Sequence, residues 1–114
     1  HEKKNYGDVA KYIAFLNGLH ADFIKKLDSI QEGDGTLLDN TLCFYGCATS
    51  KTHRAINYPI ILSGGKNLGF RHGSHLSYSD DIPLSNLFVT IANQLSSPTE
   101  SFADSTADIS EVVG

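Results

Sequence analysis

The sequence of 114 residues contains no methionine and no tryptophan, and only two cysteines and three prolines. Two cysteines are too few to build a disulfide scaffold. The apolar runs are far shorter than the ~20 residues that cross a bilayer, so we expect no membrane span. The net charge is −4, and Lys and Arg form no basic cluster. Because binding to phosphates requires such a cluster, we expect no nucleic-acid partner.

No methionine precedes His1, and the first four residues read His-Glu-Lys-Lys. A secretory signal would show a charged start followed by an apolar segment, which is not present here. We therefore expect the chain to be a fragment or a processed product of a larger protein. Its length and its ordinary globular composition predict a single domain over residues 1–114, with an irregular tail at 99–114.

Two segments have the apolar spacing of amphipathic helices. The first runs from Asp8 to Ile30, and the second begins near Pro83, since proline is tolerated in the first helical turn. The second helix ends before Ser96-Ser97-Pro98. On the first helix we expect the following residues to be buried: Val9, Ile13, Leu16, Phe23 and Leu27. The apolar stripe of the second helix contains Leu84, Leu87, Phe88, Ile91 and Leu95.

Two short segments, 42–45 and 59–62, are apolar at consecutive positions and are predicted to be strands. Continuous apolar strands are typical of sheets whose two faces are both covered by helices. The sequence therefore predicts an α/β fold with a short, mostly parallel or mixed sheet and two packed helices.

The two cysteines lie at the end of the first of these strands. On one extended strand, Cys43 and Cys47 would have Cα atoms roughly 13 Å apart, whereas a disulfide needs about 4.4–6.8 Å. They could pair only if the chain turned at Gly46. We expect two free thiols, with Cys43 buried.

A functional site is expected where the two strands end, because ligands of open α/β sheets bind beyond the carboxyl ends of the strands. The first strand leads into a loop with Ser50 and His53, and the second ends at Gly64-Gly65, where a ligand could approach the backbone closely. If these strand ends lie side by side, His53 faces the glycine pair and His75, and His1 points to the same edge.

Histidines at this edge are candidate ligands of a divalent metal, Zn, Mn or Ca. No Asp or Glu lies between Asp39 and Asp80, so further ligands would have to come from elsewhere. His53 could equally be a loop histidine that is hydrogen-bonded to backbone. His72 and His75, with Arg71 beside them, could bind zinc or an anion, or simply face solvent.

The chain resembles the C-terminal part of the HXXSHH family, a set of uncharacterised secreted bacterial proteins. Most of residues 33–108 take part in this resemblance, through the order and spacing of several short motifs. These motifs are Gly35 to Gly46, His53, Tyr58-Pro59, Ser63-Gly64-Gly65, Gly73-Ser74-His75-Leu76 and Phe102-Ala103-Asp104-Ser105-Thr106. His1 stands where the last histidine of the family's name-giving motif would be.

The resemblance implies a subdomain of a larger domain similar to alkaline phosphatases and sulfatases. It implies a secreted or periplasmic, metal-dependent hydrolase-like protein acting on a small phosphate or sulfate ester. The resemblance implies His53 as a metal ligand, and the strand-end argument adds His1 and His75. The candidate ligand-binding residues are Ser50, Arg71, Gly64 and Gly65. The implied partner is the remainder of the same polypeptide. Relatives often carry an acidic residue where this chain has residues 47–50, and an arginine in place of Ser74. A non-catalytic secreted binding or structural protein that reuses the fold is therefore the alternative.

Overall fold

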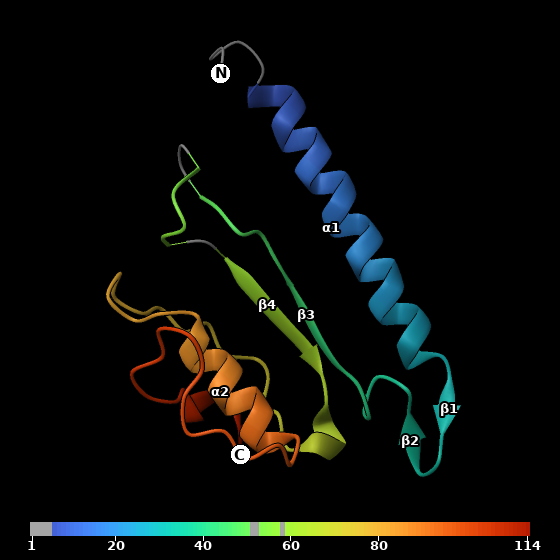
Figure 1. Cartoon of the computed structure of the whole chain (residues 1–114). Helices are drawn as coiled ribbons and strands as arrows, with labels where there is room; N and C mark the ends of the chain where they lie inside the picture. The colour runs from blue at the N-terminus through green and yellow to red at the C-terminus, as the bar shows by residue number, and fades with distance from the viewer. Residues whose placement is uncertain (1–5, 51–52, 58) are drawn as a thin grey trace.

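The computed structural model describes residues 6–50, 53–57 and 59–114. The chain forms a mixed α/β fold in which a long helix and a short helix flank a pair of strands (Figure 1). The elements are, in order, α1 (Tyr6–Asp28), β1 (Gln31–Glu32), β2 (Gly35–Thr36), β3 (Leu42–Gly46), β4 (Ile60–Gly64), the 3-10 turn η3 (Lys66–Leu68), α2 (Ser85–Gln94) and the 3-10 turn η4 (Ser110–Val112).

Both strand pairs are antiparallel, so the prediction of a mostly parallel sheet is wrong. β1 pairs with β2, and β3 pairs with β4, with Leu42 opposite Gly64 and Gly46 opposite Ile60. The sequence pattern was misleading because consecutive apolar residues indicate cover on two faces and do not specify strand direction. The two helices supply that cover here on an antiparallel hairpin.

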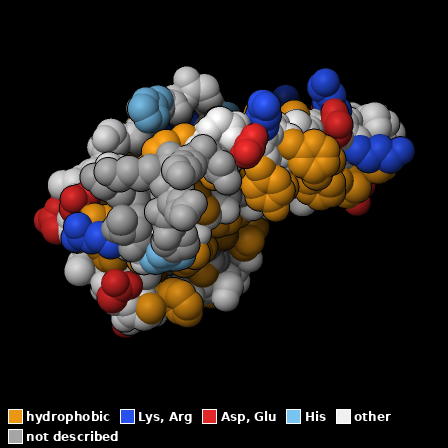
Figure 2. Space-filling model, turned by 90° about the horizontal axis from the view of Figure 1, so that it is seen from above, with side chains coloured by type: hydrophobic (Ala, Val, Ile, Leu, Met, Phe, Trp, Pro, Cys, Tyr) orange, Lys and Arg blue, Asp and Glu red, His pale blue; other side chains and the backbone are white. Residues whose placement is uncertain are grey.

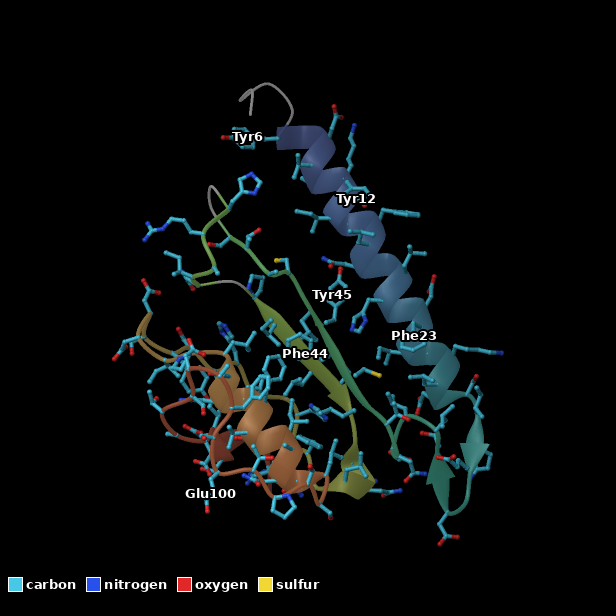
Figure 3. All side chains as sticks on the ribbon, viewed as in Figure 1. Tyr6, Tyr12, Phe23, Phe44, Tyr45 and Glu100 are labelled. Carbon is cyan, nitrogen blue, oxygen red and sulfur yellow. The ribbon has the colours of Figure 1, made fainter. Side chains whose placement is uncertain are left out.

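Neighbouring residues of β3 show how the two helices cover the hairpin. The ring of Tyr45 stacks on His20 of α1, with centroids 4.3 Å apart, and its hydroxyl donates a hydrogen bond of 2.9 Å to Asn17. The ring of Phe44 lies 5.6 Å from that of Phe88 on α2. Because adjacent strand residues point to opposite faces, α1 and α2 lie on opposite sides of β3 (Figure 3).

The predicted first helix is confirmed, but its predicted burial is wrong for most of the stripe. Leu27 is buried and Leu16 is half-buried, whereas the exposed fractions of Val9, Ile13 and Phe23 are 51%, 50% and 53%. The reason is length. A helix of 23 residues extends roughly 35 Å, and a strand of five residues extends roughly 17 Å. The hairpin cannot cover the whole helix, and hydrophobic side chains lie in the open along the arm that α1 forms (Figure 2).

The best-packed region surrounds α2. Leu87 and Val89 are buried there together with Phe70 and Ile109. The other members of the predicted stripe are half-buried, as with Leu84 and Ile91, or exposed, as with Phe88 and Leu95.

The segment 99–114 lies along α2 and contains one regular element, η4. Asn86, 1% exposed, holds its backbone at Thr106 and Ala107, and the hydroxyl of Thr90 accepts a hydrogen bond of 2.7 Å from the backbone of Ile109. Its end is tied down by an antiparallel bridge between Phe70 and Val113.

The two thiols are free, as predicted: Cys43 is buried and Cys47 is exposed. Burial raises the pKa of the Cys43 thiol above its ordinary value. Within the described ranges, no helix combines the length and the apolar character needed to cross a bilayer.

The thiols provide a direct check of the placement of β3. We expect a bulky maleimide to modify Cys47 rapidly in the native protein and to modify Cys43 at least about tenfold more slowly, because a buried, protonated thiol is a poor nucleophile. Peptide mass spectrometry of timed samples measures both rates. A denatured sample is the control, in which both thiols should react alike. Equal rates in the native protein would contradict the burial of Cys43.

Candidate functional site

The predicted meeting of the two strand ends does not occur. In the observed register, the end of β3 lies beside the start of β4, because Gly46 is opposite Ile60 and Gly64 is opposite Leu42. The loop with His53 therefore leaves one end of the hairpin, and the Gly64-Gly65 pair lies at the other end, roughly 13 Å away along the strands. The prediction placed them together because it assumed parallel strands.

The Gly64-Gly65 pair is surrounded by its own chain. The Gly65 amide donates to the carbonyl of Leu38 at 2.9 Å, and the Gly65 carbonyl accepts from the amide of Phe70 at 3.1 Å. Both glycines have positive φ, and a Cβ on Gly65 would lie 2.9 Å from the Phe70 ring. The close backbone approach predicted at these glycines is thus made by neighbouring segments of the protein.

The loop at the other end of the hairpin presents His53 at the surface with a φ of 62°. Ser50 helps to close this loop, since its backbone amide and its hydroxyl both donate to the carbonyl of Arg54, at 2.8 and 3.2 Å. His1, which was predicted to face the same edge, lies outside the described residues.

In the Arg71–His75 segment, the first two residues contact other segments of the chain and His75 faces a cleft. The backbone amide of Arg71 donates to Val112 at 2.9 Å, and Nε2 of His72 donates to the carbonyl of Gly64 at 2.5 Å, so both help to hold neighbouring segments together. His75 is exposed and lines a cleft. In the part of the chain that the structure describes, no three His, Cys, Asp or Glu side chains lie close enough together to hold a metal ion.

The cleft beside His75 has a volume of about 1040 Å³. Four parts of the chain form its walls: β4 with the residues before it, the segment 74–84, the first turns of α2, and residues 102–112. These segments are far apart in the sequence, and the three-dimensional fold brings them together. The predicted site residues Ser50, His53, Arg71, Gly64 and Gly65 do not line it.

One part of the cleft wall is aromatic. The ring of Phe88 lies 5.6 Å from that of Phe44 and 6.2 Å from that of Phe102, the second pair edge to face. Such pairs contribute about 0.5–1.5 kcal/mol beyond their buried area. The wall can therefore hold an apolar group of a ligand while keeping its own shape.

Most polar residues of the cleft come from the 74–84 segment, and Asn57, Ser85 and Asp104 add others. Ser85 donates to Asp104 at 2.7 Å, and Ser79 donates to Asp81. The hydrogen bond from Ser79 is the main reason that the pKa of the Asp81 carboxyl is lowered. Desolvation, followed by the negative charge of Glu111, raises the pKa of Tyr78.

Sequence reasoning did not assign Asp81 or Asp104 to a site. The Asp80-Asp81 pair lies close to Pro83, where the sequence predicts the start of the second helix. Asp104 belongs to a turn in which the amide of Phe102 donates to the hydroxyl of Ser105 at 2.8 Å. Its contact with Ser85 depends on the tertiary fold.

Comparison of the chain with protein-family models, with curated proteins and with solved structures gives no match.

Proposed function

We propose that this chain is part of a secreted or periplasmic hydrolase-like protein of the HXXSHH type, metal-dependent and acting on a small phosphate or sulfate ester. In this proposal the chain is a subdomain of a larger alkaline-phosphatase-like domain. One observation supports it most: two of the separate motifs behind the resemblance, Ser74-His75-Leu76 and Phe102-Ala103-Asp104, line the same cleft. A common site requires that such motifs, which are distant in sequence, lie in one cleft.

The chemistry of the cleft suits a small ester. A volume of about 1040 Å³ lies near the upper end of the range for small-molecule sites. The Phe88 and Phe102 rings would contact an apolar ester group, and His75 could donate a hydrogen bond to an ester oxygen. A phosphate or sulfate group would be repelled by Asp81 and Asp104 at close range.

In this proposal a divalent cation offsets that repulsion. A divalent cation between carboxylates and an anionic ester neutralises the charge and polarises the bond to be broken. Among the three predicted metal ligands, His75 lines the cleft, and His53 does not. The described residues alone do not complete a ligand set, so in this proposal the remainder of the polypeptide contributes the other ligands.

The second candidate is a non-catalytic secreted binding or structural protein that reuses the fold. The observation that favours it is the apolar surface of α1, where Tyr12, Phe15 and Phe23 are each more than half exposed. An exposed apolar surface of this kind marks an interaction site.

A comparison of two histidine variants tests the hydrolase proposal. We expect the intact protein to retain one or two equivalents of Zn, Mn or Ca and to hydrolyse 4-nitrophenyl phosphate or sulfate. His75→Ala should lower kcat/KM about 100-fold, since losing a metal ligand removes the stabilisation of charge in the transition state. His72→Ala is the control for a loss of structure without a loss of the site, because His72 binds the Gly64 carbonyl in the same loop and does not line the cleft.

Metal content by mass spectrometry and rates of nitrophenol release measure these effects. Equal activities of the two variants would contradict the role of His75. A protein with no retained metal and no hydrolysis of either ester would overturn the hydrolase proposal in favour of the second candidate.

A further inference from the structure

The strand β3 is paired along one edge. In an antiparallel pair, the backbone groups of alternate residues point to the partner and those between them point away. β4 takes up the first set, from Leu42 to Gly46. Among the described residues, no other element exchanges a backbone hydrogen bond with β3. The amides and carbonyls of its second set therefore form an open edge.

Each helix contacts one face of the same strand, and Phe44 remains 42% exposed. His20 of α1 stacks on Tyr45 from one side, and Phe88 of α2 lies against Phe44 on the other. Cys43 is 8% exposed. A two-stranded hairpin is marginally stable by itself, and backbone groups that are shielded from water without partners cost free energy. A further strand at the open edge of β3 would give its unpaired amides and carbonyls hydrogen-bond partners.

The open edge of β3 also lacks the protection that natural edge strands carry. Such strands are usually blunted by charged side chains, proline or a bulge, which prevent pairing with other chains. β3 reads Leu-Cys-Phe-Tyr-Gly, without a charge or a proline, and its register with β4 is unbroken.

The outer edge of β4 has a different environment. Three consecutive residues, Ile60, Ile61 and Leu62, line the cleft. Because consecutive residues point to opposite faces, a cleft lined by all three lies at the edge of the strand. The segment 74–84 forms another wall of that cleft, so the protein's own chain borders β4.

The exposed apolar side chains of α1 favour the β3 edge as well. Tyr12, Phe15, Leu19 and Phe23 recur every three or four residues and are each at least 50% exposed, so they form one row. The helix lies on the β3 side of the hairpin (Figure 1). A strand added at the β3 edge would widen the layer that α1 covers.

We infer that an extended, largely apolar segment from the remainder of the same polypeptide pairs with the open edge of β3 as a further strand. This inference rests on that part of the proposed function which makes the chain a subdomain of a larger domain. The partner is a strand because it must satisfy alternate backbone groups. It is apolar because β3 and the adjacent α1 row carry apolar side chains.

Hydrogen exchange of the intact protein at single-residue resolution tests this inference. A strand paired at one edge protects every second amide, whereas a strand paired at both edges protects consecutive amides. We expect the amides of Cys43, Phe44 and Tyr45 all to exchange at least about 100-fold more slowly than in an unstructured chain. β4 is the internal control, in which Ile61 and Leu62 should alternate between slow and fast exchange.

Alternating protection in β3 would overturn the inference. Consecutive protection that disappears when the protein is diluted from a dimer to a monomer, as followed by light scattering, would assign the added strand to a second copy and overturn the choice of the same polypeptide. Neither result depends on metal or on ester hydrolysis. If the protein shows no hydrolytic activity but still protects consecutive amides of β3, the proposed activity is wrong. The inference of an added strand is then still supported.

Discussion

Replacing Asn86 by alanine is expected to lower the free energy of unfolding by about 3 kcal/mol and to release residues 99–114 from α2. The Asn86 side chain is 1% exposed. Its carbonyl oxygen accepts hydrogen bonds from the amides of Thr106 and Ala107, at 2.8 and 3.3 Å, and its amide donates to the Thr106 hydroxyl at 3.3 Å. Alanine would leave these groups without partners, at a cost of about 1–3 kcal/mol for each one that stays buried.

Urea denaturation measures the change in stability, and hydrogen exchange at Thr106 and Ala107 measures the release of the segment. Asn93→Ala is the matched control on the same helix. Asn93 also holds a backbone segment, through hydrogen bonds of 2.7 and 3.0 Å with Thr99, but it is exposed to water. Its loss should cost about 1 kcal/mol. Both substitutions gain the same helix propensity, so similar losses would contradict the importance of burial at Asn86.

Gly64→Ala is expected to cost about 3 kcal/mol, although the side chain adds only a methyl group. Gly64 has a φ of +76°, which costs a non-glycine residue roughly 1–2 kcal/mol. A Cβ would also meet the carbonyl oxygen of Thr41, and would lie 2.7 Å from two atoms of Leu38. Overpacking of this kind adds about 1–3 kcal/mol.

Gly33→Ala separates the two contributions to the Gly64 result. Gly33 has a φ of +56°, and a Cβ there would have nothing within 4 Å. Its substitution should therefore show only the backbone cost, about 1 kcal/mol. Thermal or urea unfolding of both variants gives the difference. If Gly64→Ala were no more destabilising than Gly33→Ala, the packing of the loop around Gly64 would not be as tight as the structure has it.

Local patterns in the sequence were sufficient to identify the main elements. The spacing of apolar residues predicted α1, which the structure extends from Tyr6 to Asp28, and consecutive apolar residues predicted β3 and β4. The burial of Cys43 followed from its place in such a run. Each of these predictions concerns one segment, whose conformation depends on interactions within about four residues.

Strand direction and the composition of the cleft could not be predicted in the same way. Whether β3 and β4 run parallel depends on the path of the chain between them, and that path decides whether His53 lies near Gly64. Because the predicted strands were parallel, the prediction placed His53, Gly64 and His75 at one edge of the sheet. The cleft itself joins Ser85 with Asp104, 19 residues later, which no local spacing indicates.

The sequence by itself determined which segments are helical or extended and which cysteine lies in the core, because backbone propensity and apolar periodicity act over a few neighbouring residues. Only the tertiary structure decided that the strands are antiparallel, that Asn86 holds the 99–114 segment, and that Tyr12, Phe15 and Phe23 are exposed. Periodicity shows which side of α1 is apolar, but burial requires a second surface. The five-residue strands are too short to supply it along the full helix.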